Sequence, residues 1–521
     1  MNLPYLRPVR TKTKKYIVSF RGINYGEGYG EGEFSETVNT SSALYPCLSQ
    51  RFGRVKSDLR QIGSFALYAK DGLLQMRKEG VTDPIIIMQY NDNWEWVQGE
   101  SGTTMTEGKK QMASVGDYII IFPDKIWFNV ETGEVGKMEE ICEAEGLAFT
   151  HNTITAEEDW KFRVGDAVAI TGCTVHPENN KTIIVRKVEG KTLTFYDNSF
   201  TEGTETGSVR VAREVPDLDY ICESNYRLWG VKGNTIYGSK YGDPFNFNNF
   251  DGLSGDSYYI DVATDGEFTG CIPFGSHICF FKENVLHKLY GNRPANFQLV
   301  TSQVYGVQKG SSKSMCVINE TLFYKGTGGV YAYTGGVPEL VSECFGQRRY
   351  SEAVAASDGS RYYISMKDSG GEWHFFSYDT MHNMWMHEDN LHCVDMVRHE
   401  GKVWMLTADS WLGYIDEAAD ISDVEWSATL CPFNETMNER KGYSRFHMRL
   451  ELGDKAHLRV EIKRNTDKKW EEVYLTHNDW AKTVTVPILP ERCDSVEIRL
   501  SGKGACKLKT FIREFFIGGD R

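Results

Sequence analysis

Short runs of alternating hydrophobic and polar residues follow one another along most of the chain, and almost no stretch keeps a period of 3.6 residues. The runs are rich in Val, Ile, Tyr, Phe and Trp, and Gly, Asp and Asn separate them, which is typical of strands joined by turns. The pattern predicts a nearly all-β protein. Residues 138–148 are one of the few stretches where we expect a short helix.

One unit recurs along the chain: a β run, a turn containing Gly or Asp, and a second β run rich in aromatic residues. Successive copies begin 53, 110, 50, 44, 40 and 41 residues apart. Apart from the second, these spacings are close to the roughly 40 to 50 residues of a β-propeller blade. The repeat therefore predicts a propeller of six or seven blades. The copies begin at Phe65, Tyr118, Leu228, Ile278, Leu322, Tyr362 and Val403.

The long spacing of 110 residues predicts an insertion within the propeller, which we place at residues 147–214. Its short strands and frequent turns are typical of a small SH3-like or OB-like β-barrel. After residue 424 the strands become longer and alternate strictly, which predicts a C-terminal β-sandwich over residues 425–521. Residues 1–146 then hold an N-terminal arm and the first blades, and residues 215–424 hold the remaining blades.

Charge and composition narrow the possible functions. The chain has 521 residues and a formal net charge of −14, which disfavours nonspecific binding to duplex DNA or to an anionic membrane. No apolar run reaches the roughly 18 residues of a membrane helix. The 12 cysteines are widely spaced without a CxxC pair, which predicts reduced and mostly buried thiols. We expect no cofactor and no bound metal.

Candidate chemistry is sparse. His382, His387, His392 and Cys393 could supply metal ligands, but their spacing matches neither one helix face nor one strand face, and a blade strand pair around Trp385 is the alternative. The glycine-rich segment 26–32 resembles a phosphate loop, yet its interleaved glutamates and the lack of a following helix favour a flexible loop.

Glycosidase propellers use paired carboxylates, but no motif of the sequence places two of them together. No catalytic residue is assigned, and we expect a protein that is not an enzyme. The aromatic residues of segment 241–250 could form a ligand platform, although a blade-connecting turn at Asp243-Pro244 is favoured.

Three surfaces are candidates for contacts with other proteins. The first lies around Val164–Ile184 in the inserted barrel, because inserted domains usually serve partners. The second is the basic arm Arg7–Lys15, for which a solvated terminus is the alternative. The third is a sandwich edge near Phe511–Phe516.

The run Arg227–Phe250 (RLWGVKGNTIYGSKYGDPFNFNNF) resembles the blade signature of phage tail-hub proteins, the packaged-DNA stabilisation or nozzle proteins of short-tailed phages. The segments 44–54, 162–182 and 486–504 are similar to virion structural proteins. This resemblance implies a propeller that forms a homo-oligomeric ring, with a hexamer expected, at the neck or tail of a virion assembled in the bacterial cytoplasm. The inserted barrel and the added C-terminal sandwich of this chain are departures that do not map onto the enterobacterial hub proteins.

The resemblance implies a ring that retains packaged DNA, forms part of the ejection conduit, and contacts portal, adaptor or other tail proteins. Double-stranded DNA would pass through its axial channel, where an acidic lumen would avoid gripping phosphates. Two alternatives remain open: a receptor-binding or carbohydrate-binding propeller at a tail tip, and a polysaccharide-cleaving propeller enzyme.

Overall fold

The computed structural model confirms the predicted fold class: the protein is all-β, with β-propeller blades, an inserted small β-barrel and a C-terminal β-sandwich. Its contacts divide the chain into two compact units, Leu59–Met315 and the combination of Met1–Asp58 with Cys316–Arg521. The structure describes residues 12–56, 67–70, 73–76, 86–89, 95–96, 110–129, 131–132, 134–399, 401–409, 411–435, 439–465, 467–477 and 483–517.

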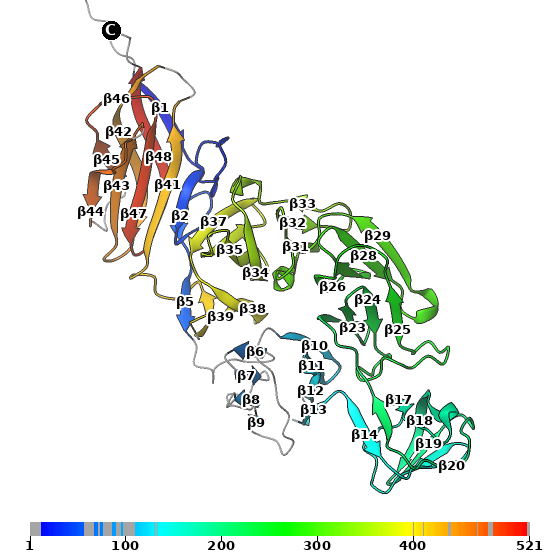
Figure 1. Cartoon of the computed structure of the whole chain (residues 1–521). Coiled ribbons are helices and arrows are strands. Elements are labelled where there is room, and N and C mark those ends of the chain that lie inside the picture. Colours follow the sequence, from blue (N-terminus) through cyan, green and yellow to red (C-terminus); the bar gives the residue numbers. More distant parts are fainter. Residues whose placement is uncertain are drawn as a thin grey trace, which may run out of the picture. The chain divides into compact units, whose positions relative to one another are not determined.

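Seven four-stranded antiparallel sheets of the blade type are present among the described residues (Figure 1). Within each sheet, short apolar strands alternate with tight turns, and the turn between β23 and β24 has Gly233 at a φ of 56°, where glycine is unstrained. Four of the sheets belong to the unit Leu59–Met315. They are β6 (Leu67–Lys70), β7 (Leu73–Met76), β8 (Ile86–Gln89) and β9 (Glu95–Trp96); β10 (Gln111–Val115), β11 (Tyr118–Phe122), β12 (Ile126–Asn129) and β13 (Val135–Lys137); β22 (Tyr220–Ser224), β23 (Arg227–Lys232), β24 (Thr235–Gly238) and β25 (Tyr258–Asp261); and β26 (Gly270–Phe274), β27 (His277–Phe281), β28 (Val285–Tyr290) and β29 (Gln298–Gln303).

The other three blades belong to the second unit, and one of them joins distant parts of the chain. Strand β5 (Gly53–Lys56) pairs antiparallel with β40 and so completes the blade β38–β40. A side chain at Gly413 in β40 would collide with the carbonyl oxygen of Val55, so this close pairing requires glycine. The remaining strands are β30 (Cys316–Ile318), β31 (Thr321–Gly326), β32 (Gly329–Tyr333) and β33 (Glu339–Leu340); β34 (Tyr350–Ser357), β35 (Arg361–Asp368), β36 (Trp373–Asp379) and β37 (Met384–Asp389); and β38 (Cys393–His399), β39 (Lys402–Thr407) and β40 (Leu412–Asp416).

Apolar cores lie between neighbouring blades of each unit. Trp229 of β23 is 1% exposed and packs edge-on against Phe280 of β27, which joins the sheets β22–β25 and β26–β29. Trp385 of β37 packs on Phe345, in the connection that follows β33. A single blade cannot bury both of its faces, so these contacts between blades supply much of the hydrophobic stabilisation.

The inserted barrel is one eight-stranded antiparallel sheet around its own core of Val, Ile, Leu and Phe side chains. Its first strand occupies the segment for which the sequence predicted a helix. That prediction is wrong, because residues 140–144 pair along β21 and the tertiary pairing overrides the local pattern. The strands are β14 (Glu140–Ala144), β15 (Ala148–Phe149), β16 (Thr153–Thr155), β17 (Ala167–Thr171), β18 (Thr182–Glu189), β19 (Thr192–Phe195), β20 (Gly203–Thr204) and β21 (Val209–Arg213).

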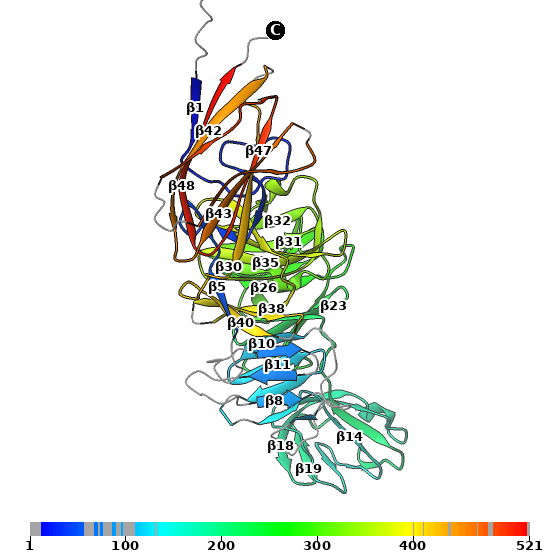
Figure 2. The same ribbon diagram turned by 90° about the vertical axis from the view of Figure 1, so that its left-hand side faces the viewer.

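Two sheets form the sandwich, and both include strands from the N-terminal segment (Figures 1 and 2). Buried and partly buried residues alternate along β47, in line with the period of two in the sequence. One sheet contains β2 (Phe34–Val38), β41 (Glu425–Phe433), β47 (Val496–Lys503), β43 (His457–Arg464) and β44 (Glu471–Thr476). The other contains β1 (Lys12–Ile17), β3 (Thr40–Ser41), β4 (Leu48–Gln50), β48 (Cys506–Ile517), β42 (Lys441–Leu452), β45 (Thr483–Pro487) and β46 (Arg492–Cys493).

One of the predicted contact surfaces is wrong, and a second is only partly described. Segment Phe511–Phe516 does not form a sheet edge, because it lies in β48 between β1 and β42, and Phe511 and Phe515 are fully buried. The described part of the basic arm is strand β1, whose Lys12 and Lys15 form ion pairs with Glu514 and Glu435 of the sandwich. Residues 7–11 of that arm lie outside the described residues.

A buried ion network holds the glycine-rich segment 26–32 against the sandwich. Arg513 of β48 is 1% exposed, and its guanidinium donates to the carboxylates of Glu435 and Glu31. Burial opposes the ionised forms, yet the hydrogen bonds and charge of Arg513 and Lys15 hold the pKa of Glu435 below its usual value. Glu31 therefore connects this segment to the sandwich.

No helix in the described ranges is long and apolar enough to cross a membrane. The few helical turns are three-residue 3₁₀ segments such as Pro177–Asn179.

Replacing Arg513 by methionine should destabilise the sandwich by about 3 to 5 kcal/mol, because two carboxylates would lose their buried partner. Arg459→Met is the matched control, since its ion pair with Glu472 is about half exposed and should contribute less than about 1 kcal/mol. Urea unfolding of both variants, followed by tryptophan fluorescence, gives the comparison. Equal losses in the two variants would contradict this account of the network.

Candidate functional site

A buried polar cluster fixes the inserted barrel to the blade β22–β25. The Arg213 guanidinium of β21 donates to Asp166 at 2.6 Å, and both side chains are almost fully buried. Asn246, in the connection between β24 and β25, accepts a hydrogen bond from the Ala167 amide at 2.9 Å and donates to Asp166 at 3.3 Å. Each polar group of the cluster is thereby partnered, as burial requires.

Phe245 packs beside this cluster. The guanidinium carbons of Arg163 and Arg213 lie 5.0 and 5.5 Å from its ring centroid, and Tyr118 contacts the ring edge-on. Asp243 accepts a hydrogen bond from the Phe245 amide, as in a tight Asx turn. The segment 241–247 is thus the predicted turn, and in addition it is the surface on which the barrel docks.

Docking creates a cleft of about 840 Å³ between barrel and blade. The barrel side is formed by the first residues of β18 together with Tyr196 and Asp197, which follow β19. The blade side is the connection between β24 and β25, from Asn248 to Asp256. Val164–Ile184, predicted as a contact surface, supplies Gly165 and residues 182–184 to this lining.

Two aromatic rings are presented to solvent in the cleft. Tyr196 is 63% exposed and Phe250 is 51% exposed. Arg186 lies 5.7 Å from the Tyr196 centroid, and Tyr259 meets Phe250 edge-on at 5.6 Å, so each ring is positioned by one neighbour. Exposed rings held at a concave site are typical of ligand recognition.

Amide and carboxylate groups line the same cleft. Asn249 donates to Asp256 at 3.2 Å and accepts from Lys240 at 3.0 Å in its hydrogen-bonded amide orientation. Burial, followed by the charge of Asp256, raises the pKa of Asp251 even though Lys240 opposes the shift. The charge of Asp197, on the barrel side of the cleft, also raises the pKa of Asp251. The cleft therefore brings together carboxylates that no sequence motif connects.

A second hollow, of about 660 Å³, lies in the other unit and is lined by Tyr25, His374 and Trp470. The Trp470 ring is partly buried and is approached by the cations of Lys463 and Arg499 at 5.0 and 4.4 Å. Because these cations already contact the Trp470 ring, we take the cleft with Tyr196 and Phe250 as the candidate site.

The predicted histidine cluster is dispersed by the structure. His387 hydrogen-bonds to the Thr37 carbonyl at 3.0 Å, and burial, with the charge of His374, lowers its pKa to about 4. His392 stacks on Trp373 with ring centroids 3.7 Å apart. In the part of the chain that the structure describes, no group of three or more His, Cys, Asp or Glu side chains is placed to hold a metal ion.

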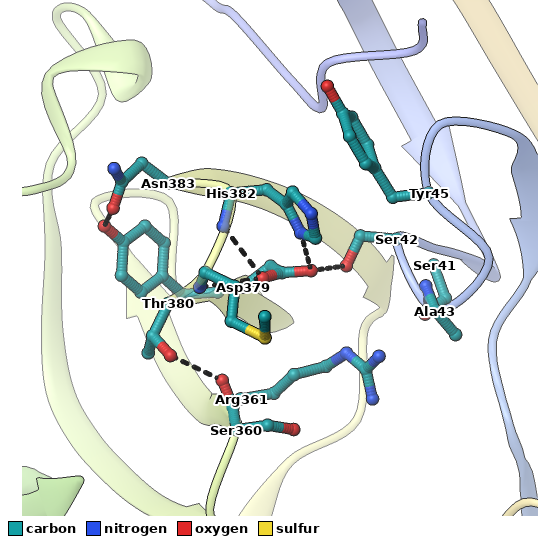
Figure 3. A network of polar contacts seen from close by, with 12 residues as sticks. Ser41, Ser42, Ala43, Tyr45, Ser360, Arg361, Asp379, Thr380, His382 and Asn383 are labelled. Carbon is teal, nitrogen blue, oxygen red and sulfur yellow. Dashed lines mark hydrogen bonds and ion pairs between the residues drawn. The ribbon is translucent and has the colours of Figure 1, made fainter. Parts of the chain in front are cut away.

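Figure 3 shows Ser42 and His382 meeting the same carboxylate, that of Asp379. Ser42 donates to Asp379 at 2.7 Å, and the His382 ring lies 3.1 Å from the same oxygen. A nucleophilic serine needs a base in contact with its own hydroxyl. Because both groups contact the acid instead, the network connects the N-terminal segment to the blade β34–β37. The Tyr45 ring is tilted against the His382 ring, with centroids 4.1 Å apart.

No family model matches the chain. No curated protein matches it either. Among solved structures, an exo-β-1,3-galactanase from Phanerochaete chrysosporium with galactose is similar at 10% identity, over 55% of this chain and 92% of that chain, with a TM-score of 0.22. The Hsv2 protein of Kluyvelomyces marxianus is similar at 9% identity, over 62% and 91%, with a TM-score of 0.25. At TM-scores this low, no residue role and no activity of these proteins can be assigned to this chain.

These comparisons contradict the predicted function of a phage tail hub that retains packaged DNA. The matched structures described above are a fungal galactanase and Hsv2, and neither is a phage protein. We withdraw that prediction, whereas the tail partners and the virion location stay predictions.

Replacing Asn246 by alanine should loosen the barrel, because the Ala167 amide and Asp166 both lose a buried partner. We expect the Ala167 amide to exchange its hydrogen at least about tenfold faster, as local opening requires less free energy. Asn248→Ala is the control, since that residue lines the cleft outside the buried cluster. Unchanged exchange at residues 166–171 in Asn246→Ala would contradict the docking role.

Proposed function

We propose that the protein binds carbohydrate, and that it holds a glycan in the cleft between the inserted barrel and the blade β22–β25. The observation that carries the proposal is the convergence of two exposed rings, Tyr196 and Phe250, with amide and carboxylate side chains in one cleft of about 840 Å³. A sugar ring has an apolar face of C–H groups and a rim of hydroxyls. An aromatic ring matches the face, and planar amides and carboxylates match the hydroxyls.

The charge of the cleft favours a neutral glycan. Asp197, Asp251 and Asp256 line it against the single cation Lys240. An acidic sugar would add a further negative charge to these carboxylates, and the net charge of −14 on the chain would repel it at longer range.

Screening against an array of neutral oligosaccharides should identify a ligand, and calorimetric titration should then measure its affinity. Tyr196→Ala and Phe250→Ala should each weaken binding by about tenfold or more, because each removes a stacking surface. Tyr226→Ala is the matched control, since Tyr226 is 61% exposed on the same blade but lies outside the lining of the cleft.

Binding that is equally strong in the cleft variants and in the control would contradict the proposed site. The failure of every neutral glycan to bind the intact protein would contradict the proposed function itself.

A second candidate function, glycoside cleavage, is favoured by one observation in the same cleft. A general acid needs a carboxyl group whose pKa is raised, and a partner carboxylate on the other side of the sugar. Asp251 has a raised pKa, and Asp197 faces the cleft from the barrel.

Incubation of the bound glycan with the protein distinguishes the two candidates. If cleavage occurs, Asp251→Asn should abolish it while binding remains, and the rate in the wild type should fall as the pH rises through the raised pKa of Asp251, where the proton is lost. Cleavage that persists in Asp251→Asn would exclude Asp251 as the acid. An intact glycan after prolonged incubation would exclude cleavage, and carbohydrate binding would remain as the proposed function.

A further inference from the structure

A small pocket in the second unit gathers three cationic side chains. It lies where the β31–β32 turn meets the chain segment between β33 and β34, and it has a volume of about 200 Å³. At about 30 Å³ per water molecule, this is room for one small ion with a few waters. The cations that line it are Lys325, Arg348 and Arg349.

Lys325 is the innermost of these cations. It lies in β31 and is 1% exposed, and its ammonium donates to the Gly326 carbonyl. Burial, with the neighbouring charge of Arg349, lowers the pKa of Lys325 to about 8. An anion placed in the pocket would be attracted by both of these positive charges.

The two arginines frame the mouth of the pocket. Nη1 of Arg349 donates to the carbonyls of Gly346 and Arg348 at 2.9 and 3.1 Å, which orients the guanidinium. The Arg348 guanidinium lies 3.5 Å from the ring centroid of Tyr25 and is held by that stacking. The acidic side chain among the lining residues is Glu343, which is exposed.

Further polar groups at the pocket can complete a shell around an anion. The turn residues Gly328 and Gly329 place backbone in the lining without side chains, and Ser342 contributes a hydroxyl that accepts from the Val330 amide at 2.9 Å. That accepted bond leaves the hydroxyl proton directed away from Val330. Guanidinium, ammonium and hydroxyl donors together suit the several oxygens of a tetrahedral anion.

We propose that this pocket binds a tetrahedral oxyanion, that is, a phosphate or sulfate group. The site belongs to the unit Met1–Asp58 with Cys316–Arg521, whereas the cleft belongs to Leu59–Met315, so it stands independently of the proposed glycan function.

Calorimetric titration of the full chain with inorganic phosphate, inorganic sulfate and glycerol phosphate tests the proposal. We expect saturable binding of at least one of them. Tighter binding of glycerol phosphate than of inorganic phosphate would identify an esterified group as the ligand, and the reverse order would identify the free ion.

Arg349→Gln and Lys325→Met should each weaken that binding by about tenfold or more, because each removes a charge-assisted hydrogen bond. Arg349 is exposed, so its variant remains informative if the change at buried Lys325 impairs folding. Lys367→Met is the matched control, since it removes one positive charge from β35 of the same unit but outside the pocket. Absence of binding by the wild type, or equal affinity in Arg349→Gln and Lys367→Met, would overturn the proposal.

Discussion

The buried contact of Asp166 with Arg213 and Asn246 is the interaction on which the candidate site depends. It joins the barrel to the turn between β24 and β25, and its groups are almost fully removed from water. A buried charge pair of this kind adds little net stability, but removing one partner costs several kcal/mol because the other charge is left buried and unpaired. Its effect is therefore to fix one orientation of the barrel. The cleft exists because of that orientation, since each of its two walls alone is an open surface.

The same principle recurs in the second unit. Arg513 holds the glycine-rich segment through Glu31 and Glu435, and Asp379 holds the N-terminal segment through Ser42. Each network joins parts of the chain that are far apart in sequence, and each has a buried centre, Arg513 with Glu435 in one and Asp379 with Ser42 in the other. Hydrophobic burial between sheets supplies the bulk of the stability, while the enclosed polar groups select which segments lie together.

The sequence predicted the elements whose signal is local. Period-two alternation and Gly or Asn turns indicated the blades, the barrel and the sandwich strands such as β47. It missed β1, β2 and β4, because those short strands pair with strands hundreds of residues away, as in the pairing of Lys12 with Phe516. Segment 140–144 has a helical composition yet pairs along β21. The cleft could not be predicted either, because Tyr196 and Phe250 become neighbours only when the barrel docks. Aromatic residues in segment 241–250 were the one available signal, and among them Phe250 lines the cleft.

Hydrogen exchange of the protein with and without a bound neutral oligosaccharide tests the central claim most directly, because it locates the glycan without altering any residue. The account predicts slower exchange at residues 182–184, 196–197 and 248–256, which come from both walls of one cleft. Protection confined to other segments, such as those around Tyr25 and Trp470 in the second hollow, would contradict it.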